Sequence, residues 1–294
     1  MKSEKIQKIN KISLKQRVKM YAHSPLSFIL LLLVAVAAAV TVFAILYMIG
    51  YILVKGVPNL SLDLFSLQYN SENVSLVPAL INTVIVTFVS LLIACPLGVF
   101  TAIYLVEYAK RGSKLVKIVR MTTETLSGIP SIVYGLFGAL FFVMTLKLGL
   151  SLLSGALTLS IMILPLIMRT TEEALRSVPD SYREGSFGLG AGRLRTVFRI
   201  VLPSASQGIL AGVILAIGRI VGESAALIYT AGTVANVPKD GLLGSGRTLS
   251  VHMYVLANEG LHIDKAYATA VVLLAIVVGI NALSAYVVKK MSKG

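Results

Sequence analysis

An uninterrupted apolar stretch from Pro25 to Val54 is the feature that most limits what this chain can fold into. No charged side chain occurs anywhere in it. A helix that crosses a bilayer needs about 20 consecutive apolar residues, whereas the core of a signal peptide has about 7–15 and precedes a small-residue cleavage site. The stretch is too long for a signal peptide and lacks a convincing cleavage site. It therefore predicts a helix that spans a membrane.

The rest of the chain has the same character. Of its 294 residues, 56% are hydrophobic and only 14% are charged, while soluble domains average about 25% charged residues. The predicted spans are residues 26–54, 78–106, 121–146, 148–169, 204–231 and 266–288. We therefore predict an all-α, polytopic membrane protein of six transmembrane helices, with one domain at 25–290 between short tails at 1–24 and 291–294.

The positions of the basic residues predict the orientation in the membrane. The net charge is +14, and most of the 27 lysines and arginines lie in the N-terminal tail, in the loops after the second and fourth spans, and at the C-terminus. Cytoplasmic loops of membrane proteins carry such an excess. We expect both termini and the 170–203 loop to be cytoplasmic. The charge is thereby explained by orientation and by contact with anionic lipid, so nucleic acid is not an expected partner.

Few residues suggest metal, redox or nucleotide chemistry. Cys95 is the single cysteine, and the histidines at 23, 252 and 262 are scattered without the spacing of metal ligands. The run from Gly241 to Thr248 resembles a phosphate-binding loop with Arg in place of Lys, but it follows no predicted strand and lies on the predicted outer side. We expect no metal, no cofactor and no catalytic residue in this chain.

The loop that reads LPLIMRTTEEALRSVPDSYREGSFGLGAGRLRTVFRIVLP, from Leu164 to Pro203, is the most informative segment. Its pattern predicts a helix that opens at Thr170 and stops at Pro179, a second helix over 181–189, a turn at 190–192 and a third helix over 193–201. Pro203 is then expected to begin the fifth span. Composition alone favours an amphipathic connector resting on lipid headgroups.

A residue pattern in this loop favours a more specific interpretation. The pattern consists of Glu184, Gly185, Ser186, Gly190, Ile200, Leu202 and Pro203. It resembles the EAA loop of ABC-importer permeases, with Gly185 and Ser186 standing where that family has two alanines. The resemblance implies a type I importer permease, which couples to a separate ATPase subunit through this loop. ATP and Mg²⁺ would then be bound by the ATPase.

Longer runs resemble the phosphate-specific transport permeases, and the PstA-type members more than the PstC-type. These runs are residues 124–138, 169–180, 218–232 and 252–260. The resemblance implies a bacterial or archaeal cell membrane, a heterodimer with a second, PstC-type permease, two PstB-type ATPase subunits and an extracytoplasmic PstS-type phosphate-binding protein.

Arg219 is expected near the middle of the fifth span, where an arginine costs roughly 2.5–3.5 kcal/mol on insertion scales. Glu223, four residues on, allows an intrahelical ion pair, although Arg before Glu is the weaker order. Alternatively, Arg219 meets an anion in transit, because guanidinium matches phosphate oxygens in a bidentate manner. Both interpretations are compatible with each other.

The run Ser127-Gly128-Ile129-Pro130-Ser131 predicts a break in the third span, because proline removes a backbone donor. A half-helix that starts near Pro130 would direct free N–H groups toward a passing anion, with Ser127 and Ser131 as hydroxyl donors. A simple packing kink is the alternative.

Three other functions remain as alternatives. Sulfate, molybdate and phosphonate permeases share the loop pattern. A self-contained channel or secondary transporter would leave that pattern unexplained, and a structural or assembly protein would not be expected to retain Arg219.

Overall fold

The computed structural model describes residues 25–110 and 112–291, and within these ranges the chain is helical, with no β-strand. The predicted tails at 1–24 and 291–294 lie outside the described residues except for Met291, which ends the last helix. The main helices are α2 (Pro25–Gly56), α3 (Val77–Ile103), α4 (Lys114–Ser127), α5 (Ser131–Gly138), α6 (Leu152–Arg176), α7 (Asp180–Gly188), α8 (Arg193–Thr196), α9 (Leu202–Val221), α10 (Ala225–Ile228), α11 (Leu249–Glu259) and α12 (Ile263–Met291).

Helix α2 forms a unit of its own up to Val54. It has 32 residues and is therefore about 48 Å long at 1.5 Å per residue, longer than the ~30 Å hydrocarbon core of a bilayer. The rings of Phe43, Tyr47 and Tyr51 stack along one side, with centroids 6.2 and 6.3 Å apart. Length and composition agree with the predicted first span.

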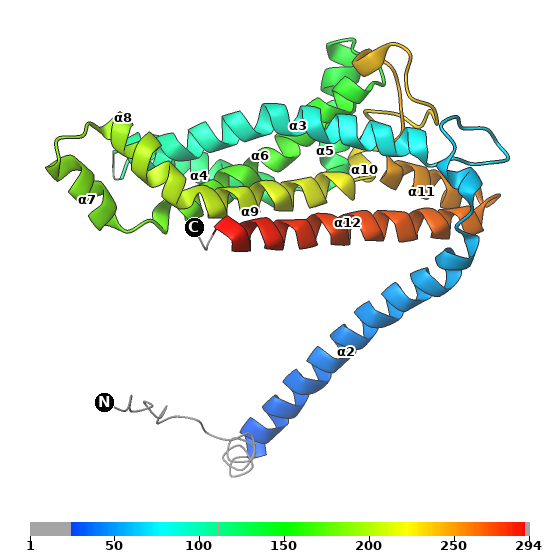
Figure 1. Ribbon diagram of the computed structural model, residues 1–294, viewed down its shortest axis with the longest axis horizontal. Helices are drawn as coiled ribbons and strands as arrows, with labels where there is room; N and C mark the ends of the chain where they lie inside the picture. Colours follow the sequence, from blue (N-terminus) through cyan, green and yellow to red (C-terminus); the bar gives the residue numbers. More distant parts are fainter. Residues whose placement is uncertain (1–24, 111, 292–294) are drawn as a thin grey trace. The chain divides into compact units, whose positions relative to one another are not determined.

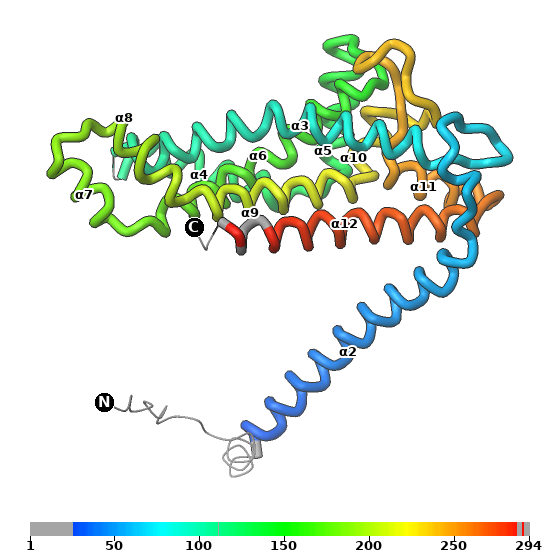
Figure 2. Tube along the Cα trace, viewed as in Figure 1, coloured from blue at the N-terminus to red at the C-terminus, as the bar shows by residue number. Residues whose placement is uncertain are grey.

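The second unit begins at Lys55, and its long helices α3, α6, α9 and α12 lie side by side (Figures 1 and 2). Helix α6 occupies the centre and packs against both α3 and α9. The main core is formed by aliphatic side chains such as Val86, Leu159, Ile163 and Ile220. The α7 and α8 helices lie at one end of this bundle, here named the α7 end, and α11 lies at the other, the α11 end.

Hydroxyl groups and a glycine bring α3 and α6 together. Ser90 donates to the carbonyl oxygen of Ala156 (3.1 Å), and the Ser160 hydroxyl, which donates to the same carbonyl oxygen (2.6 Å), lies 3.2 Å from the carbonyl oxygen of Ser90. A Cβ added at Gly98 would lie 2.8 Å from Cγ2 of Ile167. Small residues and polar links of this kind are what hold helices together in lipid, where hydrophobic burial contributes little.

The predicted third span is broken, as the sequence pattern at Ser127–Ser131 indicated. Helix α4 ends at Ser127, and the helical segment from Ser131 to Thr145 leaves at an angle of 102°. Within residues 25–110 and 112–291, five single helices are long and apolar enough to cross a membrane, and the broken pair makes a sixth candidate. The predicted start at residue 121 is wrong, since α4 begins at Lys114.

The fourth span is separated from the third by a short turn, in which Lys147 (φ 56°) and Gly149 (φ 66°) adopt left-handed conformations. Helix α6 then runs from Leu152 to Arg176, so the prediction of a span over 148–169 followed by a new helix at Thr170 is wrong. Thr170 donates to the carbonyl of Leu166 (2.9 Å), which keeps it within the helix.

Two further boundaries differ from prediction. The chain is helical without interruption from Arg193 to Val221, so Pro203 does not begin the fifth span. Proline is tolerated there because it follows a π-helical turn over Val197–Val201. The span predicted over 204–231 ends early at Val221, since Gly222 terminates α9 and the separate short helix α10 follows.

Candidate functional site

Helix α7 is the most exposed helix at the α7 end. Pro179 precedes it, and Gly190 ends the following turn in a left-handed conformation (φ 82°). Glu184 and Gly185 are exposed on α7. A Cβ added at Gly185 would meet no atom of this chain within 4 Å, so its small size is not required by intrachain packing.

A largely buried ion pair joins the middle of α7 to the bundle. The guanidinium group of Arg183 donates from Nη2 to Oε1 of Glu107 (2.7 Å), and the side chains of these two residues are 14% and 8% exposed. The same group also donates to the carbonyl oxygens of Leu175 (2.9 Å) and Val178 (2.8 Å). Hydrogen bonding to Glu107 raises the pKa of Arg183. Arg183 thereby joins α7 to the ends of both α3 and α6.

One turn further along α7, Ser186 bonds to α8. The hydroxyl oxygens of Ser186 and Thr196 lie 2.8 Å apart and share a hydrogen bond. Beside this link lies a groove of about 800 Å³. Its lining includes Gly185, Ser186 and Ile200 of the predicted coupling pattern, together with Ser181, Tyr182, Leu189, Ala191, Arg195 and Arg199.

The remaining residues of the pattern lie at the edge of this region. Leu202 is partly buried and packs on a cluster that includes Val201 and Ala205, whereas Pro203 is exposed. Of the seven predicted coupling residues, three line the groove, namely Gly185, Ser186 and Ile200, whereas Leu202 packs inward on this cluster.

At the broken span, a tyrosine compensates for the interrupted backbone. The Tyr134 hydroxyl donates to the carbonyl oxygen of Leu126 across the break (2.8 Å). Ser127 donates to the carbonyl oxygen of Thr123 (2.8 Å), so its proton is already engaged within α4. Ser131 is the first residue of α5 and is half-buried.

Arg219 and Glu223 are placed differently from expectation. Arg219 lies in the last turn of α9 and is exposed, and not in the middle of a span. Because the helix ends at Val221, Glu223 is off the helix. Its Oε1 accepts a hydrogen bond from the N–H of Ala226 (3.1 Å), at the start of α10. Among the described residues, no ion pair joins Arg219 to Glu223.

Helices α10 and α5 are in close contact, since a Cβ added at Gly135 would lie 2.8 Å from Cα of Ala226. The break and the turn at Glu223 are thus neighbours, although no hydrogen bond joins Ser127, Ser131, Arg219 and Glu223 to one another.

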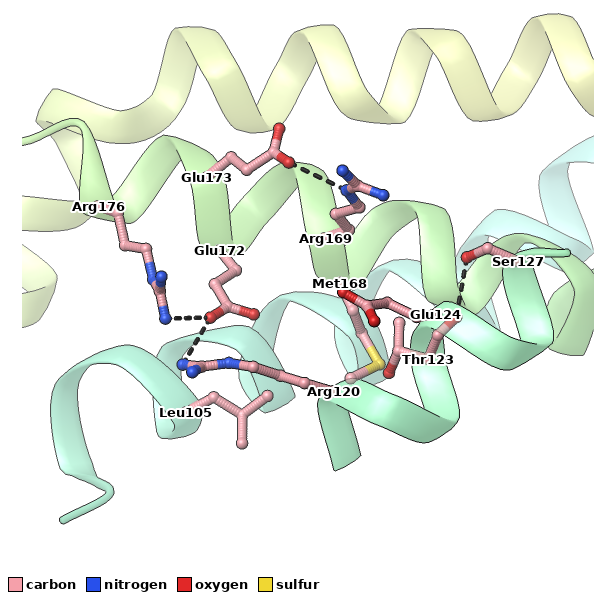
Figure 3. Close-up of a pocket in the computed structure, with 10 residues that line it drawn as sticks. All are labelled: Leu105, Arg120, Thr123, Glu124, Ser127, Met168, Arg169, Glu172, Glu173 and Arg176. Carbon is pink, nitrogen blue, oxygen red and sulfur yellow. Dashed lines mark hydrogen bonds and ion pairs between the residues drawn. The ribbon is translucent and has the colours of Figure 1, made fainter. Parts of the chain in front are cut away.

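Charged side chains that sequence reasoning missed line a cavity of about 200 Å³ between α4 and α6 (Figure 3). Arg120 and Arg176 both reach Oε1 of Glu172, each at 2.7 Å, and Arg169 pairs with Glu173 at 3.0 Å. Ser127 lies on the rim of the same cavity. The i, i+4 spacing in α6 signals the Arg176–Glu172 pair, but nothing in the sequence signals the contact with Arg120 on α4.

Residues 94–293 match the family described as binding-protein-dependent transport system inner membrane component. The chain belongs to this family. Its members are components of transporters, so this permease is not an enzyme.

Similarity to individual curated relatives is more specific than the family match. The permease is 34% identical to the probable ABC transporter permease protein YqgI of Bacillus subtilis (strain 168), over 76% of this chain and 81% of that protein. It is 35% identical to the phosphate transport system permease protein PstA 1 of Mycobacterium tuberculosis (strain CDC 1551 / Oshkosh), over 71% and 69%. It is 37% identical to PstA of Pasteurella multocida (strain Pm70), over 67% and 74%. The resemblance to PstA-type permeases is confirmed.

Solved structures confirm the fold class. A chain of the inward-facing MetNI methionine ABC transporter superposes with a TM-score of 0.58 at 21% identity, covering 73% of the permease and 93% of that chain. A chain of a bacterial ABC transporter for alginate import gives a TM-score of 0.62 at 19% identity, covering 93% and 98%. At these identities the likeness concerns the fold.

A second buried polar cluster lies at the α11 end of the permease. Arg247 is 3% exposed and its guanidinium carbon lies 4.8 Å from the ring centroid of Tyr69. His252, on α11, is fully buried and meets the edge of the same ring. Burial, together with the positive charge of Arg247, lowers the pKa of His252 to about 3, and the backbone of Val74 offsets part of this shift. With 11 residues, α11 is too short to span a bilayer.

We expect Glu107→Ala to loosen α7. The change leaves the Arg183 guanidinium without its main acceptor, and a hydrogen bond to a charged group contributes about 1.5–3 kcal/mol. Hydrogen exchange of the α7 amides should accelerate about tenfold or more. Asp180→Asn is the matched control, because Asp180 is 76% exposed and contacts Arg183 at 3.3 Å. Equal exchange in Glu107→Ala and wild type would contradict the anchoring by this pair.

We expect His252 to make the permease sensitive to acid. Its folded pKa is about 3 and its ordinary value is 6.5, so between these pH values the unfolded chain binds the additional proton. Stability should therefore fall as the pH falls below 6.5, by about 1.4 kcal/mol per pH unit. In His252→Gln this contribution is absent. Thermal unfolding from pH 7 to pH 5 tests this, and an equal loss of stability in both proteins would assign the acid sensitivity to other groups.

Proposed function

We propose that this chain is the PstA-type permease subunit of an ATP-driven importer of inorganic phosphate. The observation that carries the proposal is the identity of 33–38% with curated permeases named for phosphate transport. The exposed α7 helix supports it, because its small residue Gly185 is open to a partner rather than required by the chain's own packing.

The proposed orientation places the α7 end in the cytoplasm together with both termini. The support is the concentration of arginine on α7, α8 and the adjacent end of α6, as in Arg176, Arg183 and Arg193. The α11 end, with α11 and the 232–248 segment, then faces the extracytoplasmic side. The site of action is a bacterial or archaeal cell membrane.

The proposed complex contains a homologous PstC-type permease, PstB-type ATPase subunits and an extracytoplasmic PstS-type phosphate-binding protein. The ATPase docks on the groove beside α7 and supplies ATP and Mg²⁺, and the binding protein docks at the α11 end. Two contacts hold this helix, the Arg183–Glu107 ion pair and the Ser186–Thr196 hydrogen bond. They favour an ATPase contact at α7, because an anchored helix transmits a displacement to the bundle instead of absorbing it.

For the substrate path we propose Arg219 and Ser131 as the main contacts. Arg219 is exposed without a carboxylate partner among the described residues, and its guanidinium suits a phosphate dianion. Ser131 opens α5 just after the break, where backbone N–H groups lack helical partners. Glu223 and Ser127 belong to the surrounding shell, since both are engaged in hydrogen bonds of their own. Sulfate, molybdate and phosphonate remain the alternative substrates.

Uptake of labelled phosphate into proteoliposomes that contain the whole complex tests the function. We expect ATP-dependent uptake by wild type, and a loss of about tenfold or more in Arg219→Gln, because a charge-assisted contact contributes about 1.5–3 kcal/mol. Lys290→Gln, which removes an exposed charge on α12 outside both proposed docking surfaces, serves as the control and should behave as wild type.

Other results would contradict parts of this proposal. Uptake of sulfate but not phosphate by wild type would overturn the substrate. Unchanged phosphate uptake by an intact Arg219→Gln complex would remove Arg219 from the path.

Gly185→Leu tests the docking surface. The new side chain has open space in the permease, so we expect unchanged thermal stability of this subunit. It should nevertheless block the close approach of the ATPase and abolish co-purification. Gly279→Leu also adds a side chain in open space, but on α12, and should retain the ATPase. Normal ATPase binding by Gly185→Leu would contradict docking at this face.

A further inference from the structure

Another cavity lies at the α7 end, beside α7 and distinct from the groove assigned to the ATPase. It is larger than the cavity between α4 and α6. We name it the α7 cavity. Its volume is about 530 Å³, and charged side chains provide more than half of its lining. Five are cationic, namely Lys110, Arg120, Arg176, Arg183 and Arg193, and two are carboxylates, Glu107 and Asp180.

Both carboxylates of the α7 cavity are already committed to a single cation. Glu107 accepts two hydrogen bonds through Oε1 from Arg183 (3.1 and 2.7 Å), and Asp180 lies 3.3 Å from Nη1 of the same guanidinium. These carboxylates therefore do not neutralise the other four cations directly.

Two more of the cations share one carboxylate. Arg120 and Arg176 both contact Oε1 of Glu172 at 2.7 Å. The last two, Lys110 and Arg193, have no carboxylate within 4 Å among the described residues. Arg193 instead lies 5.8 Å from the ring centroid of Tyr108. Counting Glu172, the described residues around the cavity have two more positive than negative charges.

We propose that the α7 cavity binds a phosphate group, with Lys110 and Arg193 as its principal cations. A free phosphate dianion balances the excess of two charges and a phosphodiester headgroup offsets one of them, and guanidinium and ammonium groups are the side chains that recognise phosphate in proteins. The phosphate comes from free inorganic phosphate or from the headgroup of an anionic lipid. This site goes beyond the proposed import function and does not depend on it, since neither Arg219 nor the break at Pro130 takes part.

The position of the site gives it a structural consequence. Lys110 follows the end of α3, whereas Arg193 begins α8. A bound phosphate group would link these two segments across the cavity, next to the Arg183–Glu107 pair that anchors α7. Such a link would restrain the same helices to which α7 is tied.

The test uses the complete complex in lipid nanodiscs, without the binding protein and without ATP. Binding of labelled inorganic phosphate is measured in zwitterionic phosphatidylcholine and in the same lipid with phosphatidylglycerol. The variant is Lys110→Gln with Arg193→Gln. The control, Lys114→Gln with Lys290→Gln, removes the same charge from exposed residues outside the cavity. Retention of phosphatidylglycerol by each purified complex is measured by native mass spectrometry.

If free phosphate is the ligand, wild type and control bind it in phosphatidylcholine, and the variant binds it more weakly by about tenfold for each lost cation. If the lipid is the ligand, wild type and control retain phosphatidylglycerol and the variant loses it, while added phosphatidylglycerol displaces free phosphate. The proposal is overturned if neither ligand distinguishes the variant from the control, which is also the result expected if a segment of the ATPase fills the cavity. Transport is not measured in this experiment. Its result therefore does not depend on whether the complex imports phosphate.

Discussion

A backbone N–H or C=O group inside a bilayer has no water to bond, so a membrane-spanning chain must satisfy each group from within. This constraint explains the long uninterrupted helices, and also the way in which the one sharp break is accommodated. At the break after α4, the Tyr134 hydroxyl donates a hydrogen bond to the carbonyl oxygen of Leu126. Along the spans, hydroxyls such as those of Thr83 and Thr101 return to carbonyls four residues earlier in their own helices. These hydroxyl groups are thus retained in the apolar segments with their donors paired.

The same environment makes close helix contact dependent on small residues. In water, apolar burial would hold these helices together, but in lipid the gain comes from packing and from hydrogen bonds between helices. Added Cβ atoms at Gly98, Gly135 and Gly208 would each lie within 3 Å of an atom on a neighbouring helix, which brings α6 against α3, α5 against α10 and α9 against α6. The contact of α5 with α10 also places the broken span beside the turn that carries Glu223.

Hydropathy and charge placement were sufficient to predict the all-α architecture and the approximate spans, because lipid solubility is a property of composition. The exposed α7 helix also followed from sequence, since Pro179 and Gly190 delimit it. The errors arose at helix ends, because hydropathy does not indicate where a helix stops. Apolar residues continue past Val221, yet Gly222 ends α9, so Arg219 lies in a last turn and Glu223 leaves the helix. The Glu107–Arg183 and Arg120–Glu172 pairs join segments far apart in sequence, and no local periodicity encodes them.

The surface proposed for coupling is fixed to the bundle partly by those long-range pairs. Arg183 binds at once to Glu107 at the end of α3 and to the carbonyls that terminate α6, while Ser186 binds to Thr196 in the helical run that continues into α9. A short exposed helix held at one point would rotate about that point when pushed. With two contacts one turn apart, at Arg183 and Ser186, α7 is more restrained than that, and a displacement is passed to the segments that these residues contact next to α3, α6 and α9. Because α6 and α9 lead back to the break and to Arg219, the geometry provides a contiguous physical connection from the α7 end to the region proposed for the substrate.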